Sequence, residues 1–196
     1  KQFCFGFERF LWGLFKKLVV ADRMAVAVGT LYDGTAYTGW WVPVAAVAYI
    51  GQLYADFGGC MDIVIGVSEM FGVPLAENFR RPFAATNLSE LWRRWHITLG
   101  AWVRDYVLYP VLKSRWMGGL RRFCKKRFGK KAAREIPTYL GMFITWFCVG
   151  FWHGGSWKYI FGSGLFFFAM IAGGMLLEPV FKKLIALLRI NTEAWS

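Results

Sequence analysis

Long hydrophobic runs without charge recur along the chain and predict membrane-spanning helices. The three longest cover residues 34–55, 136–157 and 159–177, each bounded by charged residues. A helix needs about 20 mostly apolar residues to cross the hydrocarbon core of a bilayer. Glycine or proline interrupts all three runs, which membrane helices tolerate better than soluble ones. The pattern therefore predicts an all-α membrane bundle of kinked helices, with room for a re-entrant segment.

Two other segments mix aromatic and charged residues and predict helices that do not cross the lipid. Residues 1–24 alternate aromatics with charges, which is typical of an interfacial or partly buried helix. Residues 88–106 predict one amphipathic helix with Ser89 as its cap. Its apolar positions recur at steps of three and four: Leu88, Leu91, Trp92, Trp95, Leu99, Trp102 and Tyr106. Its arginines place this helix in the headgroup region or packed under the bundle.

The charge balance agrees with a membrane protein. The chain of 196 residues is 57% hydrophobic and has a net charge of +12. A nucleic-acid binder with such a charge would not have a mean hydropathy of +0.37, so nucleic acid is not an expected partner. Residues 113–134 hold ten basic and no acidic residues, and the positive-inside rule makes this loop cytoplasmic. Membrane lipids with anionic headgroups are the expected partners of this surface.

Motifs for several reaction classes are missing. The chain has no nucleophile elbow, Walker motif or zinc-protease motif, so hydrolysis of these kinds has no support. Its cysteines lie far apart, which predicts neither a disulfide framework nor a metal site. They are Cys4, Cys60, Cys124 and Cys148. The chain ends carry no terminal signature, so we expect a fragment of a longer protein.

Two histidines are the candidates for chemistry. His153 is a lone titratable group in the aromatic run 147–157, and such a group in a membrane segment is a functional hypothesis by default. The alternative is a neutral imidazole that hydrogen-bonds a carbonyl. Nearby glycines, among them Gly150 and Gly154, would let a backbone or a substrate approach. Burial disfavours the imidazolium, so we expect a neutral His153 that can accept a proton. His96 lies on the more polar flank of the helix predicted over 88–106, where an interfacial and a functional role are both open.

Asp56 and Asp62 flank a glycine-rich segment directly after a hydrophobic run. Carboxylates at such depth need partners, and the arginines available are Arg93, Arg94 and Arg104. We favour a structural polar network for both aspartates over direct catalysis.

Several motifs, taken in order, resemble bacterial membrane-bound O-acyltransferases, in the branch of the alginate O-acetylation and D-alanyl-lipoteichoic acid transfer proteins. They are Gly13–Lys17 with Ala21–Arg23, Tyr54–Gly58 to Asp62–Gly66, Glu77–Pro82, Leu91–Leu99, Trp102–Tyr106 and Gly150–Gly154. The resemblance implies a many-helix bundle around a tunnel, with an acyl donor entering from the cytoplasm and a hydroxyl acceptor outside. It makes His153 the catalytic histidine and His96 the second histidine of this branch.

The chain departs from the family pattern at a few places. Gly58, Cys60 and Met61 occupy positions where the family often has other residues, and a third histidine is absent from 161–166. The sequence after Tyr109 leans toward the D-alanyl type. We expect the family's flanking helices to lie outside residues 1–196, and this stretch to represent a partial domain.

The resemblance also implies substrates, partners and a location. The substrate-binding residues are the polar and aromatic members of its motifs: Asp56, Asp62, Asn78, Trp92, Arg93, Trp95, Arg104 and Trp152. No bound cofactor or metal is expected. The donor is an acyl thioester, either acyl-coenzyme A or an acyl carrier protein with its phosphopantetheine. The acceptor is an envelope polymer, and an extracytoplasmic acyltransferase is a further partner. The location is the bacterial cytoplasmic membrane, in several passes.

Indole N–H groups of Trp152 and Trp157 are the candidate oxyanion donors. The alternative function is a non-catalytic transporter or scaffold element.

Overall fold

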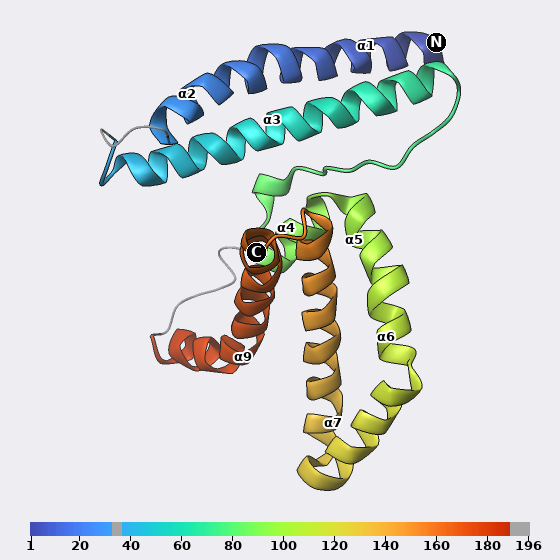
Figure 1. Cartoon of the computed structure of the whole chain (residues 1–196), viewed down its shortest axis with the longest axis vertical. Helices are drawn as coiled ribbons and strands as arrows, with labels where there is room; N and C mark the ends of the chain where they lie inside the picture. Colours follow the sequence, from blue (N-terminus) through green and yellow to red (C-terminus); the bar gives the residue numbers. More distant parts are fainter. Residues whose placement is uncertain (33–36, 189–196) are drawn as a thin grey trace. The chain divides into compact units, whose positions relative to one another are not determined.

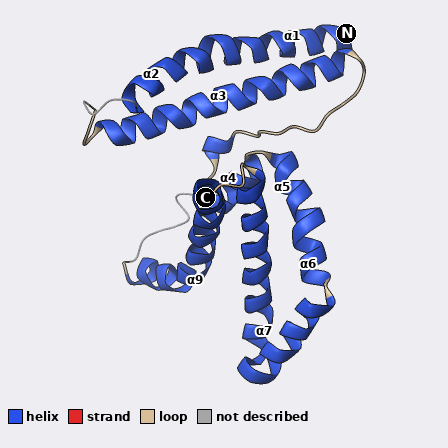
Figure 2. Cartoon of the chain, viewed as in Figure 1, coloured by secondary structure: helices blue, strands red, loops and turns tan. Residues whose placement is uncertain are grey.

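A computed structural model describes residues 1–32 and 37–188, which form helices joined by turns and loops (Figures 1 and 2). In these ranges there is no β-strand, only an isolated bridge between Phe79 and Trp95. The start of the run expected over 34–55 and the last residues of the predicted domain, 189–196, lie outside the described residues. The chain divides into two compact units, the first comprising Lys1–Ala84 with Arg94–Thr98 and the second the rest. The predicted all-α fold is confirmed for the described residues.

The first unit is an antiparallel pair of long helical arms. Helix α1 (Gln2–Leu14), the π-helix η1 (Phe15–Ala21) and α2 (Asp22–Tyr32) follow one another and lie along α3 (Trp41–Met70), as Figure 1 shows. Helices over 1–24 were predicted, and their helical state is confirmed. Their place at a membrane interface stays a prediction.

Paired glycines bring the two arms into backbone contact. A Cβ atom on Gly6 would lie 2.6 Å from the carbonyl oxygen of Gly66, and one on Gly13 would lie 2.7 Å from that of Gly59. Each pair of glycines on one helix is seven residues apart, so both face the same side after two turns. Small residues allow such close helix approach, and they are the usual means of helix association in membranes. Gly59, which lies between Asp56 and Asp62, therefore has a packing role.

The chain leaves α3 through a turn and returns as an extended segment. Gly72 has φ +79°, a conformation that favours glycine. The segment then runs past α3 to the short 3₁₀ helix η2 (Pro82–Ala84). Its rings Phe79 and Phe83 pack edge-on against Tyr54 of α3, with centroids 5.6 and 5.1 Å away. This packing fixes the extended segment to the helix pair.

The second unit is built around a bent helix. Short helices α4 (Leu88–Arg94) and α5 (Ile97–Val103) lead through η3 (Arg104–Leu108) and α6 (Tyr109–Lys113) to α7 (Arg115–Trp152). Gly129, with φ +88°, bends α7 sharply (Figure 1), and its second arm returns past α6. There a Cβ on Gly141 would lie 2.8 Å from Leu112. Helix α8 (Trp157–Tyr159), η4 (Ile160–Leu165) and α9 (Phe166–Leu187) complete the unit.

The single helix predicted over 88–106 is wrong. The structure breaks it at Trp95 and His96, because the backbone there pairs with a distant segment instead of with the preceding turn. The N–H of Ile97 donates to the carbonyl of Asn78, and the N–H of Arg80 donates to the carbonyl of Arg94. His96 has φ +48°.

Two smaller expectations are also corrected. Asn87, not Ser89, caps α4, since its side-chain oxygen accepts the N–H of Glu90 at 2.9 Å. The basic stretch 113–134 was predicted as a loop and is mostly the first arm of α7. Ser114 caps that arm by accepting the N–H of Met117 at 3.3 Å.

One helical stretch in the described part of the chain is long and apolar enough to cross a membrane. It covers Trp157–Leu187, 31 residues, and the most apolar 18-residue window within it has a mean hydropathy of 2.0. It contains the expected run 159–177. The runs expected at 34–55 and 136–157 fall mostly within α3 and α7, which do not meet the same criterion, so several membrane passes and a re-entrant segment are not confirmed.

We predict that Gly66→Ala lowers the stability of the intact protein. Its added methyl would lie 2.6 Å from the Gly6 carbonyl oxygen and the Phe10 nitrogen, both backbone atoms that cannot move independently. Overpacking of this kind costs about 1–3 kcal/mol. Thermal unfolding in detergent measures the loss as a lower Tm. Gly29→Ala is the matched control, because its Cβ would meet nothing within 4 Å. A Gly66→Ala protein as stable as the Gly29→Ala protein would contradict the close packing.

Candidate active site

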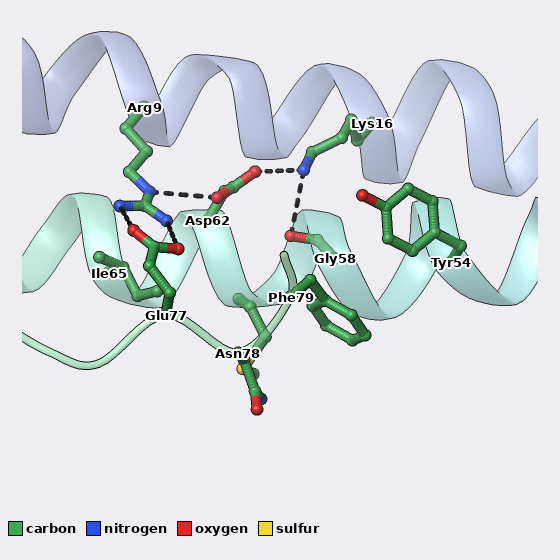
Figure 3. A pocket seen from close by; sticks show the side chains of 10 residues that line it. Arg9, Lys16, Tyr54, Gly58, Asp62, Ile65, Glu77, Asn78 and Phe79 are labelled. Atoms are coloured by element: carbon green, nitrogen blue, oxygen red, sulfur yellow. Dashed lines mark hydrogen bonds and ion pairs between the residues drawn. The ribbon is translucent and has the colours of Figure 1, made fainter. Parts of the chain in front are cut away.

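Charged residues from three segments of the first unit surround a cavity of about 160 Å³ (Figure 3). Arg9 of α1 is the centre of this network. Its Nε donates to Asp62 at 3.1 Å, and its two terminal nitrogens donate to the two Glu77 oxygens at 2.7 and 2.6 Å. Lys16 also pairs with Asp62 and donates to the Gly58 carbonyl at 3.3 Å. The network ties α1, α3 and the extended segment together.

The two-pronged hydrogen bond between Arg9 and Glu77 shifts both groups toward their charged forms. Hydrogen bonding to Arg9 holds the pKa of Glu77 below its ordinary value of 4.5, and the same bond raises the pKa of Arg9. A carboxylate and a guanidinium that stabilise each other stay ionised near neutral pH. The cavity wall is therefore charged but internally compensated, as expected of a structural network.

Asp56 and Asp62 are both ion-paired, in keeping with the structural role that the sequence favoured. Lys17 contacts Asp56 at 2.7 Å, and Arg9 and Lys16 contact Asp62. The sequence had suggested arginines of residues 93–104 as partners. That suggestion is corrected, because the cations come from α1 and η1. Arg104 pairs with its neighbour Asp105 at 2.9 Å.

His96 is held at the break between α4 and α5 by contacts within the first unit. Its Nδ1 lies 3.1 Å from the side-chain oxygen of Asn78, and its ring packs edge-on against Phe57 of α3 at 4.7 Å. Asn78 is 4% exposed. Trp95, next in sequence, packs edge-on against Phe79 at 5.0 Å. The structure thus joins His96 to the motif at 77–82, which sequence spacing did not reveal.

Trp92 lies in the second unit, in an aromatic box. Its ring centroid is 5.1 Å from that of Trp146 of α7 and 4.7 Å from that of Phe167 of α9. Its indole nitrogen is buried and has no hydrogen-bond partner among the described residues. The packing of its ring against Trp146 and Phe167 explains why Trp92 is held in this position. Arg93, which follows it, is exposed.

His153 occupies the turn that follows α7. Its N–H donates to the Val149 carbonyl at 3.1 Å, and its ring lies 4.9 Å from that of Trp152. Gly155 completes the turn with φ +67°. Both His153 and Trp152 are exposed on the surface of this chain. The imidazole is therefore accessible from outside the described helices.

The glycines around His153 serve the chain's own packing. A Cβ on Gly150 would lie 2.8 Å from the Ile160 Cα, and one on Gly154 would lie 2.6 Å from the Tyr159 ring. Gly164 of η4 faces Gly150, which lets η4 pack directly on the end of α7. Of the two expectations for these glycines, close approach of a backbone and access for a substrate, the structure shows the first at Gly150, since η4 fills that space.

The predicted site residues divide between the two units. The first unit contains Asp56, Asp62, Asn78, Trp95 and His96, and the second contains Trp92, Arg93, Arg104, Trp152 and His153. Sequence reasoning missed Arg9 and Glu77. A signal for both existed, because each is a charge placed in or beside an otherwise aromatic or apolar segment.

Comparison with known proteins gives the family. The family model described as "MBOAT, membrane-bound O-acyltransferase family" matches residues 2–195. The chain is 38% identical, over 81% of its length, to the "Probable alginate O-acetylase AlgI" of Pseudomonas putida. It is 32% identical, over 82%, to the peptidoglycan O-acetyltransferase of Helicobacter pylori. It is 35% identical, over 57%, to the teichoic acid D-alanyltransferase of Bacillus subtilis.

These matches cover 29%, 27% and 26% of the three relatives, so the chain spans under a third of each. The family match nevertheless covers almost every residue of this chain. It includes the break that carries His96 and the turn that carries His153. The chain belongs to the membrane-bound O-acyltransferase family.

Proposed function

We propose that the intact protein transfers an acyl group from a thioester to a hydroxyl of a cell-envelope polymer, with His153 as the general base. The observation that carries this proposal is the accessible histidine on a glycine-supported turn, in a chain of the membrane-bound O-acyltransferase family. The two relatives with the longer matches are named for O-acetyl transfer. Acetyl is therefore the first candidate for the acyl group, and D-alanyl the second.

The reaction needs a base that takes the proton of the hydroxyl and a hydrogen-bond donor that stabilises the oxyanion. The Nε2 or Nδ1 lone pair of a neutral His153 takes the proton of the acceptor hydroxyl while its oxygen attacks the thioester carbonyl. The tetrahedral intermediate then collapses to the ester and expels the thiolate, which recovers the proton from the imidazolium. Base catalysis by a positioned side chain contributes about 10²- to 10⁴-fold. Trp152, beside His153, is a candidate donor to the oxyanion through its indole N–H.

The proposal also covers the acyl donor, the protein partner and the membrane in which the protein resides. The donor is acyl-coenzyme A or an acyl carrier protein, and the remaining helices of the intact protein enclose the turn at His153. An extracytoplasmic acyltransferase is a further partner. The protein resides in the bacterial cytoplasmic membrane, with the basic arm of α7 toward the cytoplasm and its anionic lipids. The turn at His153 then lies nearer the outer side.

The second candidate is a non-catalytic transporter or scaffold element. Charged side chains and broken helices within membrane domains are also typical of transporters. The ion pairs of Asp56 and Asp62 would suit such a role, since they join helices without facing a reactive group. The two functions differ in what His153 does, and its substitution separates them.

We predict that His153→Ala and His153→Gln in the intact protein reduce acyl incorporation into envelope polymer by at least about 10²-fold, the share of a general base. Membrane expression should be unchanged, because the His153 side chain is exposed and its ring packs against the equally exposed Trp152. Lys158→Gln, an exposed polar position after the same turn, is the control. Activity of either His153 variant within about threefold of that control would refute the base assignment.

The orientation of α7 is testable by cysteine labelling. Cys124 is 1% exposed and unsuitable as a probe, so a single cysteine at the neighbouring exposed position Lys125 is introduced into a cysteine-free protein. We expect a membrane-impermeant thiol reagent to label Lys125→Cys only after the cells are permeabilised. Ser156→Cys, exposed beside His153, should be labelled in intact cells. Labelling of Lys125→Cys in intact cells would reverse the proposed topology.

A further inference from the structure

Asn78 is the buried polar residue on which the position of His96 depends. Its side-chain oxygen is approached by three groups: the backbone N–H of Thr98 at 3.2 Å, the Thr98 hydroxyl at 3.0 Å and Nδ1 of His96 at 3.1 Å. Asn78 itself is 4% exposed. A buried amide with such contacts is fixed in orientation by them.

The backbone N–H of Thr98 identifies the Asn78 atom that faces it. A backbone N–H can only donate, so the amide atom 3.2 Å from it is the oxygen and not the nitrogen. Nδ1 of His96 meets this same oxygen, which has no hydrogen to give. Nδ1 must therefore carry a proton. In the neutral ring the lone pair then belongs to Nε2.

The backbone at His96 is held in one conformation by hydrogen bonds to a distant segment. His96 has φ +48°, a conformation that costs energy for a residue with a side chain and that is found at functional sites. Hydrogen bonds from Ile97 to the Asn78 carbonyl and from Arg80 to the Arg94 carbonyl, at 3.0 and 2.9 Å, hold the strained turn on both sides. The Phe57 ring lies edge-on to the imidazole at 4.7 Å.

We infer that Asn78 is a positioning residue, which holds His96 as the Nδ1–H tautomer and so makes Nε2 the nitrogen that accepts a proton or a hydrogen bond during acyl transfer. Asn78 acts through His96, a different role from the substrate contact that the sequence predicts for it. The use of Nε2 in the reaction rests on the proposed function. The tautomer does not, since the described contacts alone determine it.

Nitrogen NMR of the intact protein measures the tautomer directly. The protein is labelled with ¹⁵N-histidine, placed in lipid nanodiscs and studied at a pH where His96 is neutral, with His96→Gln used to assign the two signals. We expect a protonated Nδ1 and an unprotonated Nε2. In Asn78→Leu, which cannot accept the hydrogen bond, the population should move toward the Nε2–H form that isolated histidine prefers in water. An Nε2–H tautomer in the unaltered protein would overturn the inference, whether or not acyl transfer is observed.

Kinetics separate positioning from a merely structural role. Asn78→Leu should lower kcat by about 10- to 100-fold with little change in KM. Replacing the charged residue that fixes the histidine tautomer in a hydrolase triad costs more, roughly 10⁴-fold, and the partner here is neutral. Asn78→Asp keeps the acceptor but adds a negative charge, which stabilises the imidazolium. The acidic limb of its pH–rate profile should move up by about 1–3 pH units.

Thr98→Val is the matched control, because it removes one donor to Asn78 and leaves the contact with His96 in place. Its pH–rate profile should match that of the unaltered protein. If Asn78→Asp lowers the amount of folded protein without moving the limb, Asn78 is only structural and the inference fails. If the unaltered protein has no transferase activity, the proposed function fails and the NMR result still decides the tautomer.

Discussion

The close approach of α3 to the first helical arm is the constraint on which the first unit depends. Gly6 meets Gly66 and Gly13 meets Gly59 at distances that leave no space for a Cβ atom. At this separation the short Asp62 side chain contacts both Arg9 and Lys16. The charges on the two helical arms thus compensate each other within the protein, which suits helices that lie in or against a membrane. A wider gap would leave these charges to water or to lipid.

From this helix pair a chain of contacts leads to His96. Arg9 holds Glu77 through two hydrogen bonds, and the next residue is Asn78, whose oxygen holds His96. The backbone of the same segment interrupts the helix at His96 and fixes its ring against Phe57. In the second unit a different glycine pair, Gly150 and Gly164, supports the turn of His153. Each candidate catalytic histidine therefore lies at a helix break that packing of the chain itself maintains.

The sequence predicted those features that depend on local pattern and failed where distant segments decide. Hydrophobic periodicity indicated helices, and the isolation of His153 in an aromatic run singled it out. The break at His96 could not be predicted, because the hydrogen bonds that cause it come from Asn78 and Arg80, far earlier in the chain. The partners of Asp62 were missed for the same reason, since Arg9 is 53 residues away. Glycine was ambiguous as well: Gly150 fits substrate access and helix packing equally well in the sequence, and the structure decides for packing.

Transfer of an acyl group by the purified intact protein tests the proposed function most directly. The protein in nanodiscs is incubated with radiolabelled acetyl-coenzyme A or a D-alanyl carrier protein, together with deacylated envelope polymer. The account predicts alkali-labile label on the polymer and one free thiol for each ester formed, with both products lost in His153→Gln. Intact thioester with unlabelled polymer for both donors, or the same transfer by the His153→Gln protein, would contradict it.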